Sequence, residues 1–283
     1  MPPRTVPTAR QRRLGAELRK MREAAGLNAR EASALMGIDH TKISHMETAR
    51  FGVGSDRLRV LASNYGCTDQ AYVNALIAMA TERRKGWWEE YRGTLPAGFL
   101  DLTELESKAT FLRTYQVAHL PGLTQTEDTA RAIFGFVFPR ISNEDVDARI
   151  AHRMQRAKIL DQPNGPAFTA VIHEAALRMR FGGREPARKQ LDHLLSLSER
   201  PNVTIRVLPF EADGFAGSGQ AVLYAGGTVP QLDTIHLDSA HGALFIDSDA
   251  QLSGYRELLS AMERSSLTET ESRDLMRDIA QTL

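Results

Sequence analysis

The apolar positions at the start of the chain recur with the spacing of an amphipathic helix. Leu14, Leu18 and Met21 are separated by four and three residues, so they fall on one face of a helix over residues 10–25. Gly26 follows and can adopt the left-handed backbone conformation that ends many helices. The pattern predicts a helix that packs one face against a core and stops at residue 25.

Four more short helices are predicted by the same period. They cover residues 28–36, 40–48, 55–65 and 69–79. Asn28 and Asp39 are suitable N-cap residues for the second and third of the five helices. Gly37 lies between these two, where a larger side chain would clash at a steep helix crossing. Apolar anchors flank this turn on both sides, namely Ala32, Leu35, Ile38, Ile43 and Met46. Two short helices joined through a glycine turn are typical of a repressor-type helix-turn-helix.

Within residues 12–80, the segment LRKMREAAGLNAREASALMGIDHTKISHMETAR resembles the DNA-binding domain of the xenobiotic-response-element (Cro/CI-type repressor) family. The resemblance implies a five-helix, λ-repressor-like domain over residues 10–82 that binds double-stranded DNA. Two positions depart from the family pattern. Ala29 stands where the family often has Gln, and residues 47–52 read ETARFG where Glu-x-Gly is common. The fold tolerates both changes, but they leave the detailed phosphate contacts open.

In this family, the outer face of the third helix reaches base edges in the major groove. The matching positions here are His40, Thr41, Lys42, Ser44 and His45. A lysine donates to guanine, a hydroxyl donates or accepts, and an imidazole does either according to its tautomer. Contacts to DNA phosphates, which set register and give salt-dependent affinity, are expected from Asn28, Arg30, Arg50 and Arg57.

The character of the sequence changes from residue 83 onward, and the period of the apolar positions shifts after the first helices of this part. Helices are predicted first, over residues 103–113, 125–137 and 142–160. Segments rich in β-branched residues follow at 167–172, 203–208, 220–224, 234–237 and 243–246. Further helices are predicted at 174–179, 186–197, 250–264 and 268–283. We therefore expect a multidomain fold, with an α-helical N-terminal domain and an α/β or α+β C-terminal domain. The latter is helical over 83–162 and has a mixed sheet with helices over 163–283.

Charge divides the chain in the same place. Residues 1–85 hold 15 Lys and Arg against 8 Asp and Glu, a net charge of +7, whereas the rest holds 20 against 27, a net charge of −7. A basic domain joined to an acidic one favours a polyanion partner for the basic domain and a different partner for the acidic domain. Cys67 is the one cysteine, which excludes an intramolecular disulfide. Residues 1–9 are expected to form a disordered tail. With no signal-peptide pattern, the expected location is the cytoplasm, at the nucleoid.

Several motifs in the second part resemble another family. They are KGWWEEYRGTLPAGFLDLTELESKATFLRTYQVAHLPGLTQTEDTARAI, VIHEAALR, PNVTIRVLPFEADGF and YRELLSAME. In this order they resemble the C-terminal domain of actinobacterial WhiJ-like and Scr-type regulators, from about residue 83 to the end. The resemblance implies a regulator that is often encoded beside a small partner protein, and it implies neither a ligand nor a reaction.

Candidate partner or ligand contacts in this part are Trp87, Trp88, Tyr91, Phe215, His236 and His241. The aromatic group near residue 88 suggests either a ligand cage or packing against the body of the domain, and packing is the more common role. Residues 214–219 form a glycine-rich loop, but a strand follows it where a phosphate-binding loop needs a helix. We interpret it as a flexible loop that can close over a ligand or partner.

Catalytic patterns are incomplete. His236 and Asp238 share one side of a strand, which permits a metal pair or a hydrolytic dyad, but no third ligand or nucleophile stands at a diagnostic spacing. His173 and Glu174 begin a pattern like that of zinc proteases, yet Leu177 occupies the place of the second histidine. We therefore expect no enzyme activity, no cofactor and no metal.

Three functions remain open from the sequence. The first is a dimeric DNA-binding transcription regulator on a palindromic operator, whose C-terminal domain binds a small protein or ligand that modulates DNA binding. The second is an antitoxin-like module that sequesters a partner and autoregulates its operon. The third is a DNA-tethered enzyme that uses His236 or His241, which we consider the weakest of the three.

Overall fold

The computed structural model describes residues 6–82, 85–214, 216, 219–239 and 242–283. The chain divides into two compact units, Met1–Trp87 and Trp88–Leu283, and each is described by itself. Phe215, His241 and part of the predicted tail and glycine-rich loop lie outside the described residues. In the described part of the chain, no helix has both the length and the apolar character needed to cross a membrane.

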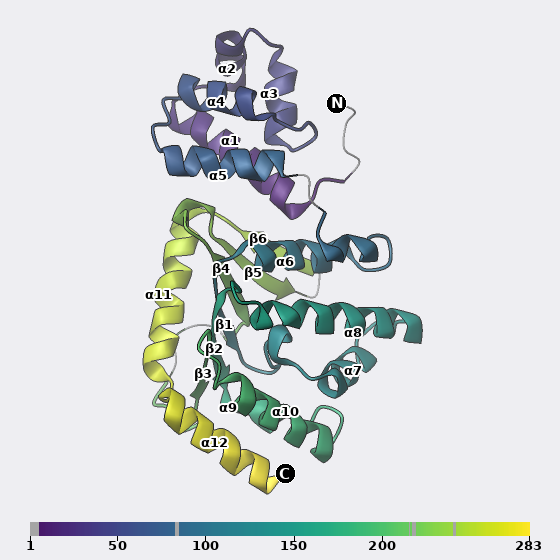
Figure 1. Ribbon diagram of the computed structural model, residues 1–283. Coiled ribbons are helices and arrows are strands. Elements are labelled where there is room, and N and C mark those ends of the chain that lie inside the picture. Colours follow the sequence, from purple (N-terminus) through teal and green to yellow (C-terminus); the bar gives the residue numbers. More distant parts are fainter. Residues whose placement is uncertain (1–5, 83–84, 215, 217–218, 240–241) are drawn as a thin grey trace. The chain divides into compact units, whose positions relative to one another are not determined.

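Five helices make up the first unit, as predicted. They are α1 (Ala9–Ala24), α2 (Ala29–Met36), α3 (His40–Glu47), α4 (Ser55–Asn64) and α5 (Gln70–Thr81) (Figure 1). Leu18, Ile43, Leu58 and Leu76 contribute the fully buried centre of their packing. Their burial stabilises each short helix, which would be marginal in isolation.

Local backbone chemistry sets the helix boundaries in this unit. Thr8 forms a capping box with Gln11 at the start of α1, so the helix begins inside the tail predicted for residues 1–9. Gly37 ends α2 in the left-handed conformation, with φ of 62°. This conformation carries no steric penalty for glycine, and it allows the chain to turn directly into α3.

A six-stranded mixed sheet forms the centre of the second unit. Its strands are β1 (Phe111–Gln116), β2 (Ala167–His173), β3 (Val203–Leu208), β4 (Val222–Gly226), β5 (Thr234–Ser239) and β6 (Gly242–Ile246). Their order is β3-β2-β1-β4-β5-β6. The pairs β1–β2 and β2–β3 are parallel, whereas β1–β4, β4–β5 and β5–β6 are antiparallel. The predicted mixed sheet is confirmed.

Helices cover both faces of this sheet (Figure 1). They are α6 (Ala97–Lys108), α7 (Glu127–Gly135), α8 (Asn143–Ala157), α9 (Glu174–Arg178), α10 (Arg184–Leu197), α11 (Asp249–Ser265) and α12 (Glu269–Thr282). Helix α11 packs on one face, where Leu252 and Leu259 join Tyr115 and Ile235 in one core. On the other face, helices that include α9, α10 and α12 enclose a larger core around Phe168. Alternating residues of β1, β2, β3 and β4 therefore enter two separate cores.

The helix predicted over residues 103–113 was wrong at its end, and the segment 83–162 is not wholly helical. Helix α6 stops at Lys108, and Phe111–Gln116 form strand β1 in the middle of the sheet. Hydrogen-bonding partners on both sides, β2 and β4, hold this segment in extended form. These pairings join residues that are far apart in sequence, so helical periodicity in residues 103–113 could not reveal them.

Candidate nucleic-acid interface

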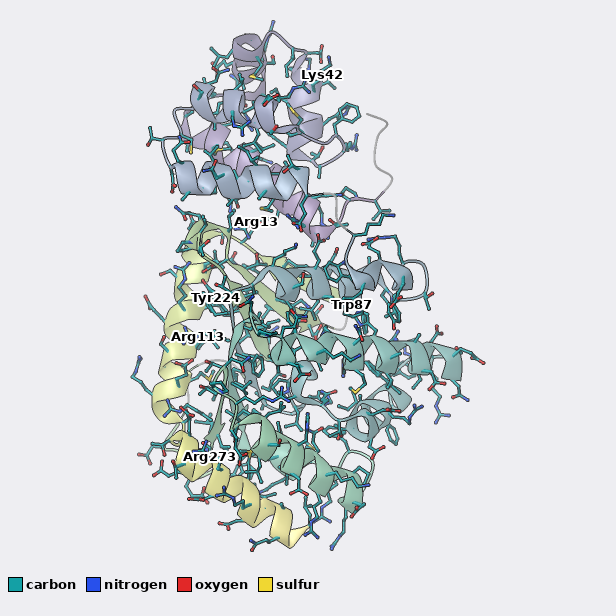
Figure 2. The ribbon with its side chains drawn as sticks, in the orientation of Figure 1. Arg13, Lys42, Trp87, Arg113, Tyr224 and Arg273 are labelled. Carbon is teal, nitrogen blue, oxygen red and sulfur yellow. The ribbon has the colours of Figure 1, made fainter. Side chains whose placement is uncertain are left out.

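Helix α3 presents its polar side to solvent. Ile43 and Met46 are 1% and 4% exposed on the inner side of the helix. His40, Thr41, Lys42 and Ser44 are exposed on its outer side, and Figure 2 shows Lys42 among the surface side chains of this unit. The structure thus brings four of the five predicted base-reading residues onto one accessible surface.

Asp39 organises the start of this helix. Its carboxylate accepts a hydrogen bond from the backbone N–H of Thr41 at 2.7 Å, and a second from the Thr41 hydroxyl. These two bonds lower the pKa of the Asp39 carboxyl. The Thr41 hydroxyl therefore donates to the cap in this structure. Its oxygen can still accept a hydrogen bond, and its methyl group can pack on a thymine methyl.

His45 is less accessible than the other predicted base-reading residues. It is half-buried, and its ring packs edge-on against Phe51 with 4.7 Å between ring centroids. The sequence motif did not indicate this contact. Phe51 belongs to the segment 47–52 that departs from the family pattern. This segment therefore provides the ring against which His45 packs.

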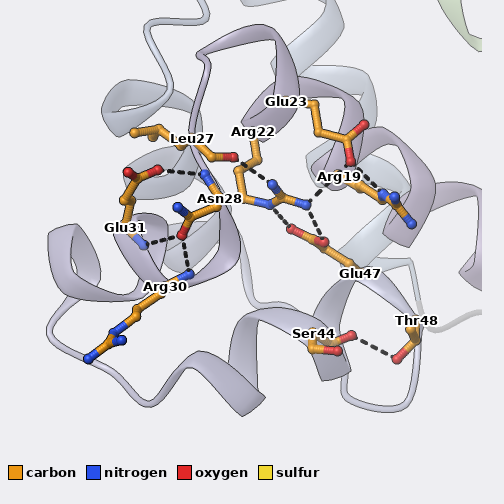
Figure 3. A network of polar contacts seen from close by, with 10 residues as sticks. All are labelled: Arg19, Arg22, Glu23, Leu27, Asn28, Arg30, Glu31, Ser44, Glu47 and Thr48. Atoms are coloured by element: carbon orange, nitrogen blue, oxygen red, sulfur yellow. Dashed lines mark hydrogen bonds and ion pairs between the residues drawn. The ribbon is translucent and has the colours of Figure 1, made fainter.

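The predicted phosphate contacts lie around α3 on exposed positions. The side-chain oxygen of Asn28 accepts hydrogen bonds from the backbone N–H groups of Arg30 and Glu31, at 2.9 and 3.0 Å, so its amino group stays directed away from the helix end. In Figure 3 the Arg30 side chain extends away from the other residues drawn. Arg50 and Arg57 are also exposed. An amide donor at a helix N-terminus together with exposed guanidinium groups suits an anionic backbone.

An ion pair that sequence reasoning missed fixes α3 to α1. Arg22 donates from Nε to Oε1 of Glu47 at 2.6 Å and from Nη2 to Oε2 at 3.0 Å (Figure 3). The side chains are 9% and 10% exposed, so the pair is largely shielded from water. Burial beside this carboxylate raises the pKa of Tyr65 to about 12. Glu47 was identified only as part of a divergent turn, and nothing in its spacing pointed to Arg22.

Close packing at the end of α3 depends on two small residues. A Cβ atom on Gly15 would lie 2.3 Å from the backbone oxygen of Glu47, so only glycine allows α1 to approach at this point. Ala49 has a φ of 59°, the left-handed region that glycine prefers. It occupies the turn in which the family pattern places glycine, and this explains how ETARFG still closes the same turn.

A second buried cluster joins α1 to α5. Glu17 is 2% exposed and accepts hydrogen bonds from Arg13 Nε at 2.7 Å and from the Tyr72 hydroxyl at 2.6 Å. Burial and the Glu17 carboxylate together raise the pKa of Tyr72. Arg13 therefore has a structural role. Its charge is engaged by Glu17, so we do not count it among the positive charges that could contact DNA.

The aromatic residues predicted as partner contacts occupy a short 3₁₀ helix, Trp87–Tyr91. Trp88 is 8% exposed, and Trp87 and Tyr91 are partly exposed. The Tyr91 ring packs edge-on against His152 of α8, with 5.1 Å between centroids, and burial raises the pKa of Tyr91. For Trp88 and Tyr91, burial fits packing better than a ligand cage.

His236 is buried on the sheet. It is 5% exposed, lies 5.2 Å from the Phe245 ring on the neighbouring strand, and its Nε2 is 3.5 Å from Oδ1 of Asp238. Burial lowers the pKa of His236, which the nearby Asp238 carboxylate partly offsets. The two residues do share one side of β5, as the alternation predicted.

Near this strand, Glu106 of α6 and Arg156 of α8 form a buried ion pair with a closest distance of 3.1 Å. Their side chains are 3% and 7% exposed. Burial raises the pKa of Glu106, and Arg156 opposes that shift. Gly122 makes room for the guanidinium, because a Cβ atom there would lie 2.4 Å from Arg156 Nη2. Sequence reasoning missed this pair, whose members are separated by a strand and a helix.

The fold and the surface of α3 define the first unit as a helix-turn-helix domain. A family model described as a helix-turn-helix domain matches residues 13–76. A second model, described as domain of unknown function DUF5753, matches residues 99–278, which is more than half of the chain. The chain belongs to the DUF5753 family. No curated protein and no solved structure matches it.

Proposed function

We propose that this protein is a sequence-specific DNA-binding transcription regulator in which helix α3 enters the major groove. The observation that carries the proposal is the exposed outer face of α3, with Lys42 on it, beside the Asn28 cap of α2. The helix-turn-helix match over residues 13–76 supports DNA as the partner. Lys42 and its neighbours would contact base edges, while Arg30 and Arg57 would contact phosphates.

The finer parts of the proposal concern assembly and signal. One helix-turn-helix domain covers a single half-site, so we propose a homodimer on a palindromic operator. The acidic C-terminal unit would receive the signal that modulates DNA binding. Its resemblance to WhiJ-like and Scr-type regulators, which are often encoded beside a small partner protein, supports this role.

In vitro selection tests the proposal. The full-length protein is incubated with a pool of random duplexes, and bound molecules are amplified over several rounds. We expect one enriched sequence with inverted symmetry, bound far more tightly than a scrambled duplex. A pool that stays random after many rounds would contradict sequence-specific binding.

A second candidate function is a module that sequesters a partner protein, and one feature favours it. Phe136 and Phe138, in the loop between α7 and α8, are 88% and 94% exposed. Two phenylalanines offer roughly 300–500 Å² of apolar area, less than the ~800 Å² per partner of a standard interface. They are therefore suited to act as anchors in an apolar groove of another protein.

Co-expression with the product of the neighbouring gene tests this candidate. We expect stoichiometric co-purification that is lost when Phe136 and Phe138 are both replaced by Ser. Leu244→Ser, at another exposed apolar position of the same unit, is the matched control. Equal recovery with the parent and with the double variant would contradict a role for these two rings.

A further inference from the structure

A cavity lies between helix α11 and strands β4 and β5 of the second unit, whereas the residues assigned above to DNA belong to the first unit. Its volume is about 380 Å³. Its apolar lining includes Val222 and Leu237 of the sheet and Leu258 and Met262 of the helix, of which Leu258 is half-buried and the other three are buried. This volume lies within the range of roughly 300–1,000 Å³ that is usual for small-molecule sites, which are likewise mostly apolar.

The polar side chains that line the cavity are neutral. Gln220 and Gln251 contribute amide groups, each of which can donate and accept hydrogen bonds. Among the described residues of the lining, none carries a formal charge. A charged ligand would therefore lose its hydration without gaining a counter-charge. A neutral ligand with one hydrogen-bonding group has a smaller desolvation cost, which a hydrogen bond to a glutamine amide can offset.

Helix α11 is fixed to the sheet along a different stripe from the one that borders the cavity. Arg256 donates to the Tyr224 hydroxyl at 2.5 Å, and Arg113 of β1 donates to Glu263 at 3.0 Å and to Ser260 at 3.2 Å. Figure 2 marks Arg113 and Tyr224 on the sheet beside this helix. At 100° per residue, these contacts lie on one side of the buried Leu252 and Leu259, and the cavity residues lie on the other.

This arrangement holds the cavity open without help from a ligand. The polar contacts attach one side of α11 to the sheet, and the buried leucines attach its centre. The side of α11 that borders the cavity is therefore not required to pack against the sheet. A preformed site binds a ligand with less ordering cost than one that must form on binding.

Gly254 of helix α11 offers a position from which access to the cavity can be tested. It lines the cavity from within α11, where glycine is less favourable than alanine. Its backbone is helical and a Cβ atom there would meet no atom within 4 Å, so neither backbone strain nor crowding requires glycine. Gly254 is exposed at the edge of the cavity, so a larger side chain there has open space to occupy.

We infer that this cavity is a binding site for a neutral, mostly apolar small molecule that carries one hydrogen-bonding group. The ligand lies against Leu237, Leu258 and Met262, and its polar group bonds to Gln220 or Gln251. The site also supplies a chemical class for the signal received by the C-terminal unit, and in that respect alone the inference rests on the proposed function.

The first test uses N-phenyl-1-naphthylamine, a neutral aromatic amine that fluoresces in apolar surroundings, with full-length protein and no DNA. We expect saturable binding at one site. Gly254→Leu places a side chain at the edge of the cavity and should weaken binding by at least about 10-fold, since even one methylene in an apolar pocket changes affinity by 10- to 200-fold. Ser253→Leu adds the same side chain to the neighbouring exposed position, outside the lining, and should change the dissociation constant less than 2-fold.

A second measurement locates the probe without relying on the fold of a variant. The protein is labelled with ¹³C at its methionine methyl groups, and the Met262 signal is assigned as the one missing from Met262→Leu. We expect this signal to shift as the probe saturates. No saturable binding, equal binding by Gly254→Leu and the parent, or binding without a shift at Met262 would each overturn the inference. Because DNA is absent, a failure here leaves the DNA-binding proposal intact, and a failed selection leaves this result intact.

Discussion

Arg22 of helix α1 and Glu47, the last residue of helix α3, are joined by two contacts, 2.6 Å from Nε to Oε1 and 3.0 Å from Nη2 to Oε2. This pairing attaches the proposed base-reading helix to the longest helix of its unit at the end opposite Asp39. The position of α3 therefore depends on a charged contact in addition to the apolar contacts of Ile43 and Met46.

Removing one partner of this pair should loosen α3. Arg22→Ala leaves the partly buried Glu47 carboxylate without its hydrogen-bonding partner, which costs about 1–3 kcal/mol. Hydrogen exchange should show the loss as a lower opening free energy for amides of α1 and α3. Arg19→Ala removes a neighbouring exposed arginine on the same helix and is the control. Equal protection of α3 in Arg22→Ala and Arg19→Ala would contradict this role.

The Glu106–Arg156 pair in the second unit allows a different experiment, because both members can be replaced by apolar residues. Arg156→Met alone should destabilise the unit by about 3 kcal/mol or more, since Glu106 is left buried and unpaired. The double variant Glu106→Leu/Arg156→Met should recover most of the loss. Urea denaturation of the three proteins measures both effects. If the double variant is no more stable than Arg156→Met, the loss of stability does not come from the unpaired Glu106 charge, and this explanation is wrong.

Stability should fall in mild acid because of His152. Burial, and then the neighbouring Arg156 and Arg153, lower its pKa from 6.5 to about 4. Its Nε2 lies 3.1 Å from the Thr103 hydroxyl. Between pH 6.5 and 4 the unfolded chain binds this proton and the folded chain does not, so stability decreases by up to about 1.4 kcal/mol per pH unit as pH falls.

The pH prediction is tested by measuring the free energy of unfolding against pH for the parent and for His152→Gln. His119, His193 and His236 also have pKa values lowered by burial and contribute the same sign. The variant should therefore retain a slope that is shallower than the parent's over this window. Parallel profiles for the two proteins would show that His152 does not titrate as described.

Phosphate contacts should appear in the salt dependence of DNA binding. Each lost contact reduces the slope of log K against log salt by about 1. Arg57→Ala should therefore bind the selected duplex and a scrambled duplex more weakly by similar factors, with a flatter slope for both. Arg277→Ala, on helix α12 of the other unit, is the control. An unchanged slope for Arg57→Ala would remove this residue from the interface.

Elements with local signals were predictable from the sequence. Asn28, Gly37 and Asp39 fix the boundaries of α2 and α3 by capping and turn chemistry that involves only neighbouring residues. The same holds for α12, which begins at the Thr268 capping box. Strands β2 and β3 were equally clear, because their β-branched, apolar residues are typical of buried strands.

Strand β1 was missed because its polar residues are satisfied only by distant partners. Arg113 bonds to Glu263, and the Thr114 hydroxyl donates to the backbone oxygen of Val222 at 2.8 Å. The segment FLRTYQ contains polar residues whose partners are distant in sequence. Its composition alone therefore does not indicate a central strand. The Glu106–Arg156 pair was hidden for the same reason, since a charge on an amphipathic helix is ordinarily solvated and nothing local marks it as buried.

The candidate base-reading surface was predictable in outline, because helical periodicity alone separates Ile43 and Met46 from the outward positions. What the sequence could not reveal is how the outward residues are engaged. The Thr41 hydroxyl bonds to Asp39, and the His45 ring packs on Phe51. Lys42 remains the exposed cation of this helix and carries the most weight in the prediction of specificity.

The most direct test of the account compares sequence preference in the parent and in the double variant Lys42→Ala/His45→Ala. The quantity is the ratio of the dissociation constants for a scrambled and for the selected duplex, measured at one salt concentration. For the parent we expect a ratio of at least about 1,000, and for the variant, with its far-ultraviolet circular dichroism unchanged, a ratio at least about 10-fold lower. A folded variant that keeps the parent's ratio would contradict the claim that α3 reads the bases.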